Sequence, residues 1–149
     1  MIRTLVGLAA FVLVLQAAPA AGAETLGCDY KQAFKGGGWR DAAVTLKLEG
    51  GDVTAISYLN GIASGKEGGG YACAFDASAS DGKSVWTREG NRTSVKLKDE
   101  KNSTFEIRRS KKGFTIRFLE MSREYCGFGA EFPESVALDR GKKKCRIKY

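Results

Sequence analysis

The sequence predicts an all-β protein. Beyond residue 40, apolar and polar residues alternate with a period of two through most of the chain, which places every second side chain on one face of a strand. Clusters of glycine, asparagine, aspartate and serine interrupt these runs about every 8–12 residues, a spacing typical of strands joined by short turns. After residue 23 no segment has the apolar spacing of an amphipathic helix, although residues 121–125 can form a single helical turn.

The expected strands follow this alternation along the chain. Val44, Leu46 and Leu48 give the first apolar face, and a turn at 49–52 leads into a strand over 53–60. Further strands are expected near 71–75, 84–88, 95–97, 105–108, 114–118, 136–138 and 145–149. We therefore predict a single antiparallel meander of about eight strands that closes into a small barrel, with a β-sandwich as the alternative.

The N-terminus has the composition of a secretory signal peptide. Arg3 precedes an apolar run over 5–15, and the small residues Ala21, Gly22 and Ala23 supply a cleavage site. The run is shorter than the roughly 20 apolar residues that span a bilayer. We expect cleavage after Ala23, a single disulfide-stapled β domain over 24–149, a periplasmic or secreted location and no transmembrane segment.

Four cysteines, Cys28, Cys73, Cys126 and Cys145, predict two disulfides in an exported chain. Cys28 lies too far beyond the apolar run to be a lipid-modified N-terminus. Three pairings are open, and the sequence does not choose among them. We favour Cys28–Cys73 with Cys126–Cys145, because each bridge then closes a shorter loop within one half of the chain. No C-x-x-C motif supports a thioredoxin-type role.

The sequence contains no histidine, which excludes Ser-His and Cys-His nucleophile pairs and the common mixed His/Cys zinc sites. A pair of carboxylates for glycoside hydrolysis is the remaining catalytic alternative. Its candidates are Glu120, Glu124, Glu131 and Glu134. Acids beside basic strands are more often solvated or ion-paired, so we expect no enzyme, no cofactor and no metal.

Residues 125–133 form the most distinctive stretch, with Cys126, three aromatic residues, two glycines and a proline in nine positions. One interpretation is a disulfide-anchored bend at a strand boundary, since Pro133 removes a backbone donor. The other is a rigid binding loop that presents Phe128, Glu131 or Phe132.

The same stretch carries a resemblance to a known family. The pattern Cys-Gly-x-x-Ala-x-hydrophobic is formed by Cys126, Gly127, Ala130 and Phe132. It resembles a motif near the end of small periplasmic β-barrel proteins of the lysozyme-inhibitor kind. The resemblance covers about ten residues and the general plan of signal peptide, many strands and late cysteines. The Ser-Gly loop with a nearby tyrosine of those inhibitors is matched only loosely, by Ser64, Gly65 and Tyr71.

The segment 64–70, Ser-Gly-Lys-Glu-Gly-Gly-Gly, is expected to connect two strands of a hairpin. It is not a phosphate-binding loop, because Glu67 follows the lysine where Ser or Thr is needed and no helix comes after it. Besides a plain flexible connection, a functional interpretation remains: Lys66 at the tip enters an acidic cleft in a partner. A cation between the two carboxylates of a glycosidase opposes catalysis, and this is the mechanism that the resemblance implies.

Basic residues concentrate in the second half of the chain. Removal of residues 1–23 takes away one arginine and no acid, so the net charge falls from +7 to +6. The predicted basic patch consists of Arg108, Arg109, Lys111, Lys112, Lys142, Lys143 and Lys144. Such a patch attracts anionic lipids, glycans, cell-wall polymers or acidic proteins, whereas nucleic acid is not expected outside the cell. The alternative interpretation is that these are solvated positions whose lysines discourage edge-to-edge aggregation.

These patterns predict an exported binding protein. The first hypothesis is an inhibitor of a lysozyme or another glycosidase that inserts a loop into the enzyme cleft. Its contacts would be Lys66, Ser64, Tyr71, Tyr125, Phe128, Glu131 and Phe132. The alternative is a binding module for anionic envelope polymers or lipids, which would use the basic patch.

Overall fold

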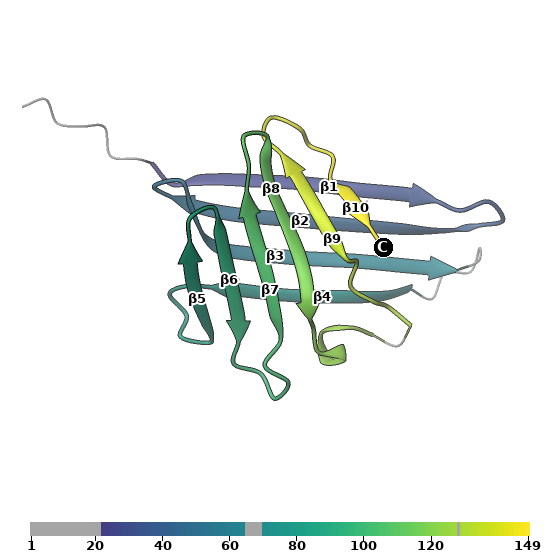
Figure 1. The fold of residues 1–149 in the computed structure, drawn as a ribbon. Helices are drawn as coiled ribbons and strands as arrows, with labels where there is room; N and C mark the ends of the chain where they lie inside the picture. The colour runs from purple at the N-terminus through teal and green to yellow at the C-terminus, as the bar shows by residue number, and fades with distance from the viewer. Residues whose placement is uncertain (1–21, 65–69, 128) are drawn as a thin grey trace, which may run out of the picture.

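The computed structural model describes residues 22–64, 70–127 and 129–149 (Figure 1). In these ranges the chain forms two antiparallel sheets and one short 3-10 helix, so the all-β prediction is confirmed. The 3-10 helix η1 (Arg123–Tyr125) lies where the sequence allows a single helical turn. Most of the predicted signal peptide lies outside the described residues.

The first half of the chain forms a four-stranded sheet in the order β1-β2-β3-β4. Its strands are β1 (Glu24–Ala33), β2 (Gly38–Glu49), β3 (Asp52–Ser64) and β4 (Gly70–Ser78). The second half forms a six-stranded sheet in the order β10-β9-β8-β7-β6-β5. Its strands are β5 (Ser84–Glu89), β6 (Arg92–Leu97), β7 (Thr104–Arg109), β8 (Gly113–Glu120), β9 (Ser135–Asp139) and β10 (Arg146–Lys148).

The two sheets pack face to face as a sandwich. In Figure 1 the strands of the six-stranded sheet run across those of the four-stranded sheet. The four-stranded sheet also extends past its partner at the end where β1 and β3 finish and β2 and β4 begin (Figure 1). That end therefore has a face on which no second sheet packs.

The prediction of a closed barrel is wrong. Each strand pairs with its neighbour in the chain, as a meander requires, except that β4 and β5 belong to different sheets. Asp81 holds the connection between them, because its carboxylate accepts hydrogen bonds from the backbone N–H groups of Ser78 and Lys83. The free side of β4 is taken instead by Gly127, whose N–H donates to the carbonyl of Ala72 at 2.7 Å. The sandwich given as the alternative fits this arrangement.

The core lies between the inner faces of the two sheets. Tyr58 and Phe75 from the four-stranded sheet meet Phe105 and Phe118 from the six-stranded sheet, with ring centroids 4.8 Å apart for Tyr58 and Phe118 and 5.2 Å apart for Phe75 and Phe105. Phe132, from the β8–β9 connection, packs 5.1 Å from Phe118. Each aromatic pair of this kind stabilises the fold by about 0.5–1.5 kcal/mol beyond the burial of its surface. The cluster therefore stabilises the packing of one sheet against the other.

The predicted disulfide pairing is also wrong. The bridges are Cys28–Cys145 and Cys73–Cys126, each joining a strand of the four-stranded sheet to the second half of the chain. Each half folds into one sheet, so the cysteines on the inner face of the first sheet meet those of the second half. Cysteines are brought together by sheet packing and not by short separation along the chain, so the bridges that close the shorter loops do not form.

This pairing has a direct test. Non-reducing peptide mapping should recover one peptide pair that links Cys28 to Cys145 and another that links Cys73 to Cys126. Replacing Cys73 and Cys126 together by alanine should lower the free energy of unfolding by about 2–5 kcal/mol, because the unfolded chain loses a cross-link. A peptide joining Cys28 to Cys73 would contradict the structure.

Candidate functional site

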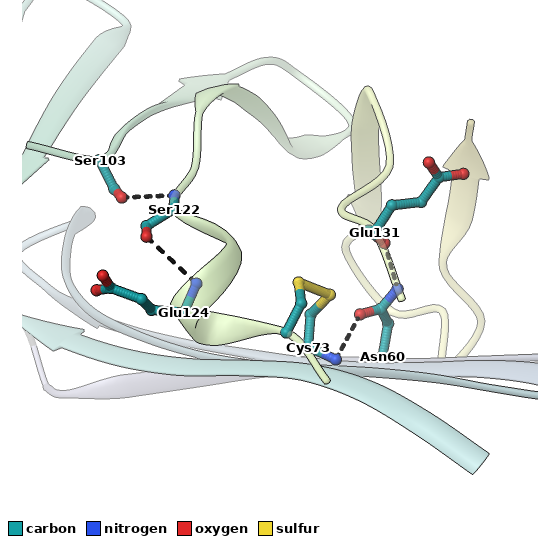
Figure 2. Close-up of a disulfide and its surroundings, with 7 residues drawn as sticks. Asn60, Cys73, Ser103, Ser122, Glu124 and Glu131 are labelled. Carbon is teal, nitrogen blue, oxygen red and sulfur yellow. Dashed lines mark hydrogen bonds between the residues drawn. A yellow bond between two sulfur atoms is a disulfide. The ribbon is translucent and has the colours of Figure 1, made fainter. Parts of the chain in front are cut away.

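The connection between β8 and β9 is held in place at its start by a serine pair. Ser122 caps η1, and its hydroxyl accepts a hydrogen bond from the N–H of Glu124. The N–H of Ser122 donates to the hydroxyl of Ser103 at 2.8 Å, and both serines are buried (Figure 2). These contacts anchor the first half of the connection to the loop before β7.

The second half of the connection is anchored to the four-stranded sheet. The side chain of Asn60 donates to the carbonyl of Glu131 at 3.0 Å and accepts from the N–H of Cys73 at 3.3 Å (Figure 2). The disulfide Cys73–Cys126 lies beside this amide (Figure 2). Asn60 is 4 % exposed, so its bonds replace those to water that burial removes.

The connection lines a cleft of about 830 Å³. Its apolar surface comes from Phe118, Leu119, Met121, Phe132 and Pro133, and its charged groups are Arg123, Glu131 and Glu134. Glu134 is bound by Lys148, with 2.6 Å between Nζ and the carboxylate. This hydrogen bond and the ammonium charge lower the pKa of Glu134. The cleft thus combines an apolar wall with charges that lie at the molecular surface.

The structure brings together two segments that the sequence analysis treated separately. Tyr71 on β4 packs against the 126–131 loop, since a Cβ on Gly129 would lie 3.5 Å from the Tyr71 ring. Glu131 in the same loop is exposed. Ser64 is the last residue of β3. Lys66 and Phe128 lie outside the described residues.

Phe132 and Tyr125 have structural contacts that the sequence did not reveal. Phe132 is half-buried among the rings of Tyr58 and Phe118. The ring centroid of Tyr125 lies 6.0 Å from that of Phe75. Both residues therefore support the loop from the core side. The sequence analysis did not identify Asn60 as an anchor. The available signal was its position two residues after Tyr58, which puts a polar side chain on the apolar face of the strand.

Tyr125 faces the carboxylate of Asp99, and the pKa values of both groups are shifted. Burial and the nearby charge of Asp99 together raise the pKa of Tyr125 to about 12. Burial alone would raise the pKa of Asp99, but hydrogen bonds from Ser103 outweigh it and lower that pKa. One of these bonds, from the N–H of Ser103, is 2.8 Å long.

The predicted basic patch separates into two environments. Lys111 and Lys112 lie in the β7–β8 turn, and Lys143 and Lys144 lie in the β9–β10 connection. The N–H of Arg140 donates to the carbonyl of Lys112 at 2.8 Å, which joins the two turns. We call these four exposed lysines the basic edge. None of them has an ion-pair partner in the part of the chain that the structure describes.

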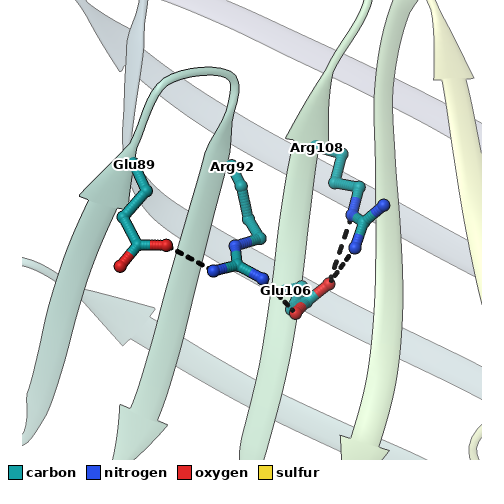
Figure 3. Close-up of polar contacts among 4 residues, drawn as sticks. All are labelled: Glu89, Arg92, Glu106 and Arg108. Carbon is teal, nitrogen blue, oxygen red and sulfur yellow. Dashed lines mark hydrogen bonds and ion pairs between the residues drawn. The ribbon is translucent and has the colours of Figure 1, made fainter.

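The remaining members of the predicted patch are engaged elsewhere. Arg108 belongs to a row of charges on the outer face of the six-stranded sheet, where Glu106 lies between Arg92 and Arg108 (Figure 3). Arg109 donates to the carbonyl of Gly51 at 3.1 Å. Lys142 pairs with Asp139 at 3.5 Å. Arg108 and Lys142 are therefore ion-paired, and Arg109 is held by a neutral carbonyl away from the four lysines of the basic edge.

The described residues contain neither a metal-binding cluster of three or more acidic or cysteine side chains nor a helix suited to crossing a membrane. The four glutamates considered for glycoside chemistry are all exposed, and Glu134 is ion-paired. Comparison of the chain with protein-family models, curated proteins and solved structures gives no match.

The Tyr125–Asp99 contact predicts a pH dependence of stability. The pKa of Tyr125 is raised from 10.0 to about 12 in the folded protein. Its contribution to stability is thus complete below pH 10 and is lost as the pH rises from 10 through 12. Urea unfolding of the wild type should show a steeper loss of stability across this range than Tyr125→Phe shows. Parallel curves for the two proteins would refute the contact.

Proposed function

We propose that this chain is an exported binding protein that captures anionic polymers or anionic lipid surfaces through the basic edge. The observation that supports this most directly is the joining of two exposed lysine pairs by the bond between Arg140 and Lys112, with no carboxylate paired to any of the four lysines among the described residues. Two disulfides fit a protein that folds in an oxidising compartment.

The basic edge combines a favourable net charge with a high local density of positive charge that is unpaired among the described residues. The net charge of +7, or +6 after removal of residues 1–23, gives a long-range attraction for anions. Nearby carboxylates, such as Asp139 and Glu24, are already paired with Lys142, Arg146 and Arg140. Lysines without such partners keep their full attraction for a phosphate, sulfate or carboxylate on a ligand. Binding of this kind is screened as ionic strength rises.

The proposal predicts a position-specific loss of binding. Replacing Lys111, Lys112, Lys143 and Lys144 together by alanine should weaken binding to dextran sulfate by at least about tenfold at low salt. A control variant removes the same charge from exposed lysines elsewhere, at Lys35, Lys47, Lys96 and Lys101. Binding would be measured by calorimetry at two salt concentrations, with neutral dextran as the negative ligand and anionic lipid vesicles as a second arm. Equal losses in the two variants would mean that net charge alone, and not the basic edge, attracts the polymer.

We propose as a second candidate the inhibition of a lysozyme or another glycosidase by the β3–β4 end of the protein. The disulfide Cys73–Cys126, the bond between Gly127 and Ala72, and the contact of Tyr71 with Gly129 support this proposal. Together they hold the 126–131 loop against β4 at the end where the four-stranded sheet extends past the six-stranded sheet (Figure 1). A loop held against β4 in this way suits insertion into a cleft. Lys66, which lies outside the described residues, would be the cation that opposes the catalytic carboxylates.

The second candidate predicts inhibition at near-stoichiometric amounts. Cell-wall lysis by c-, g- and i-type lysozymes should be blocked for at least one type by the oxidised protein, at both low and moderate salt. Lys66→Ala should abolish inhibition, whereas Lys47→Ala, an exposed lysine on β2, should leave it unchanged. Full activity of all three lysozymes in the presence of the protein would remove this candidate and leave the basic-edge proposal standing.

A further inference from the structure

The outer face of the four-stranded sheet carries an exposed tryptophan. On β2 the buried residues are Ala42, Val44, Leu46 and Leu48, so the odd-numbered residues point away from the core. Trp39 is one of them, and it is 38 % exposed. Leu59, on the same face of β3, is 49 % exposed. Two large apolar side chains are therefore left uncovered on the outer face of this sheet.

Small residues surround Trp39 on this face. Register pairs Trp39 with Ala33 on β1 and with Ala63 on β3, and Ala63 in turn pairs with Gly70 on β4. A Cβ on Gly61 would lie 3.0 Å from Cζ3 of Trp39, and a Cβ on Gly70 would lie 3.9 Å from Cζ2. The six-membered ring of the indole therefore lies down across β3 towards β4. One face of the ring covers Gly61, which is buried without any side chain of its own.

Polar groups lie at the rim of the indole. Oδ1 of Asp41 is 2.8 Å from the same Cβ position on Gly61, so the carboxylate and the ring edge meet above this glycine. Lys31 on β1 lies directly opposite Asp41 and is exposed. The hydrogen bonds and ion pairs found among the described residues do not include either side chain. A flat apolar surface is thus bordered by one acceptor and one donor.

We propose that Trp39, Asp41 and Lys31 form a binding platform for a neutral glycan, a site that is independent of the basic edge. One face of a pyranose ring presents C–H groups, whose partial positive charge suits the negative face of an indole. The hydroxyl groups around the same ring would donate to Asp41 and accept from Lys31. The flat indole thus matches the C–H face of a sugar, and the polar groups at its rim match the sugar hydroxyl groups.

Two other occupants fit the platform less well. A second copy of the chain would need an interface of roughly 1,000 Å² or more, whereas Trp39 and Leu59 are the only large exposed apolar side chains on this face in the part of the chain that the structure describes. A cationic ligand would approach Asp41 and the indole against the charge of Lys31 and the net positive charge of the whole protein. A neutral sugar meets neither obstacle.

The test is an NMR titration of ¹⁵N-labelled protein with a β-1,4-linked N-acetylglucosamine hexamer. The indole N–H signal of Trp39 and the amides of Gly61 and Gly70 should shift. The indole signal of Trp86, which is half-buried with its Nε1 bonded to Ser84, should stay in place. Trp39→Ala should lower the affinity about tenfold or more, the scale of one lost aromatic stacking contact.

Two further variants and three contrary outcomes make the result decisive. Trp86→Phe is the matched control and should bind as the wild type does. Asp41→Asn should keep the shift at Trp39 but weaken binding several-fold, since the amide is a poorer acceptor than the carboxylate. The proposal is overturned by an unshifted Trp39 signal at millimolar hexamer, or by unchanged affinity in Trp39→Ala. It is also overturned by a dimer in sedimentation experiments that disappears in Trp39→Ala, because a second copy would then cover this face.

Discussion

The attachment of the second half of the chain to both edges of the four-stranded sheet is the constraint on which the rest of the structure depends. Cys28 on β1 is bonded to Cys145, and Cys73 on β4 is bonded to Cys126. Next to each bridge, backbone hydrogen bonds continue the attachment, with Asp29 bonded to Lys143 and Cys145 on one side and Ala72 bonded to Gly127 on the other. The six-stranded sheet is thereby held across the inner face, where the aromatic cluster fills the space between the sheets.

Two of the surfaces to which we assign binding, the basic edge and the 126–131 loop, follow from these attachments. The bonds at Asp29 hold the β9–β10 connection beside β1, and the bond between Arg140 and Lys112 places that connection next to the β7–β8 turn. The bridge at Cys126 holds the 126–131 loop on β4. A rigid sandwich thus presents its charged and aromatic groups from turns and outer faces whose backbone is fixed, which is the usual division between a scaffold and its binding residues.

Local pattern was enough to predict the strands, because a side chain's face in a strand depends only on its own position in the alternation. Val44, Ile56 and Ile116 are buried as that rule requires. β1 was missed although its inner-face residues Leu26, Cys28 and Tyr30 alternate with Gly27, Asp29 and Lys31 as a strand requires, because this alternation is short and contains only one aliphatic residue. Closure and disulfide pairing were predicted wrongly because both depend on how the two sheets pack, and no local pattern encodes that packing.

For the candidate sites the sequence supplied residue types but not their partners. The lysines were visible as a cluster, yet only the structure separates those of the basic edge from Lys142, which is paired with Asp139. Trp39 drew no attention in the sequence, because an isolated tryptophan in a strand is most often a core residue. Its outward direction follows from the register of β2, which is fixed by Val44, Leu46 and Leu48 on the opposite face.

The two disulfides are nested, with the Cys73–Cys126 ring enclosed by the ring that Cys28–Cys145 closes. Breaking any one peptide bond between Cys28 and Cys145 therefore leaves a single covalent molecule. Proteases cut exposed turns, and here a nick in a turn such as 110–113 does not release either sheet. The bridges thus keep the binding surfaces together in a chain that has already been cut.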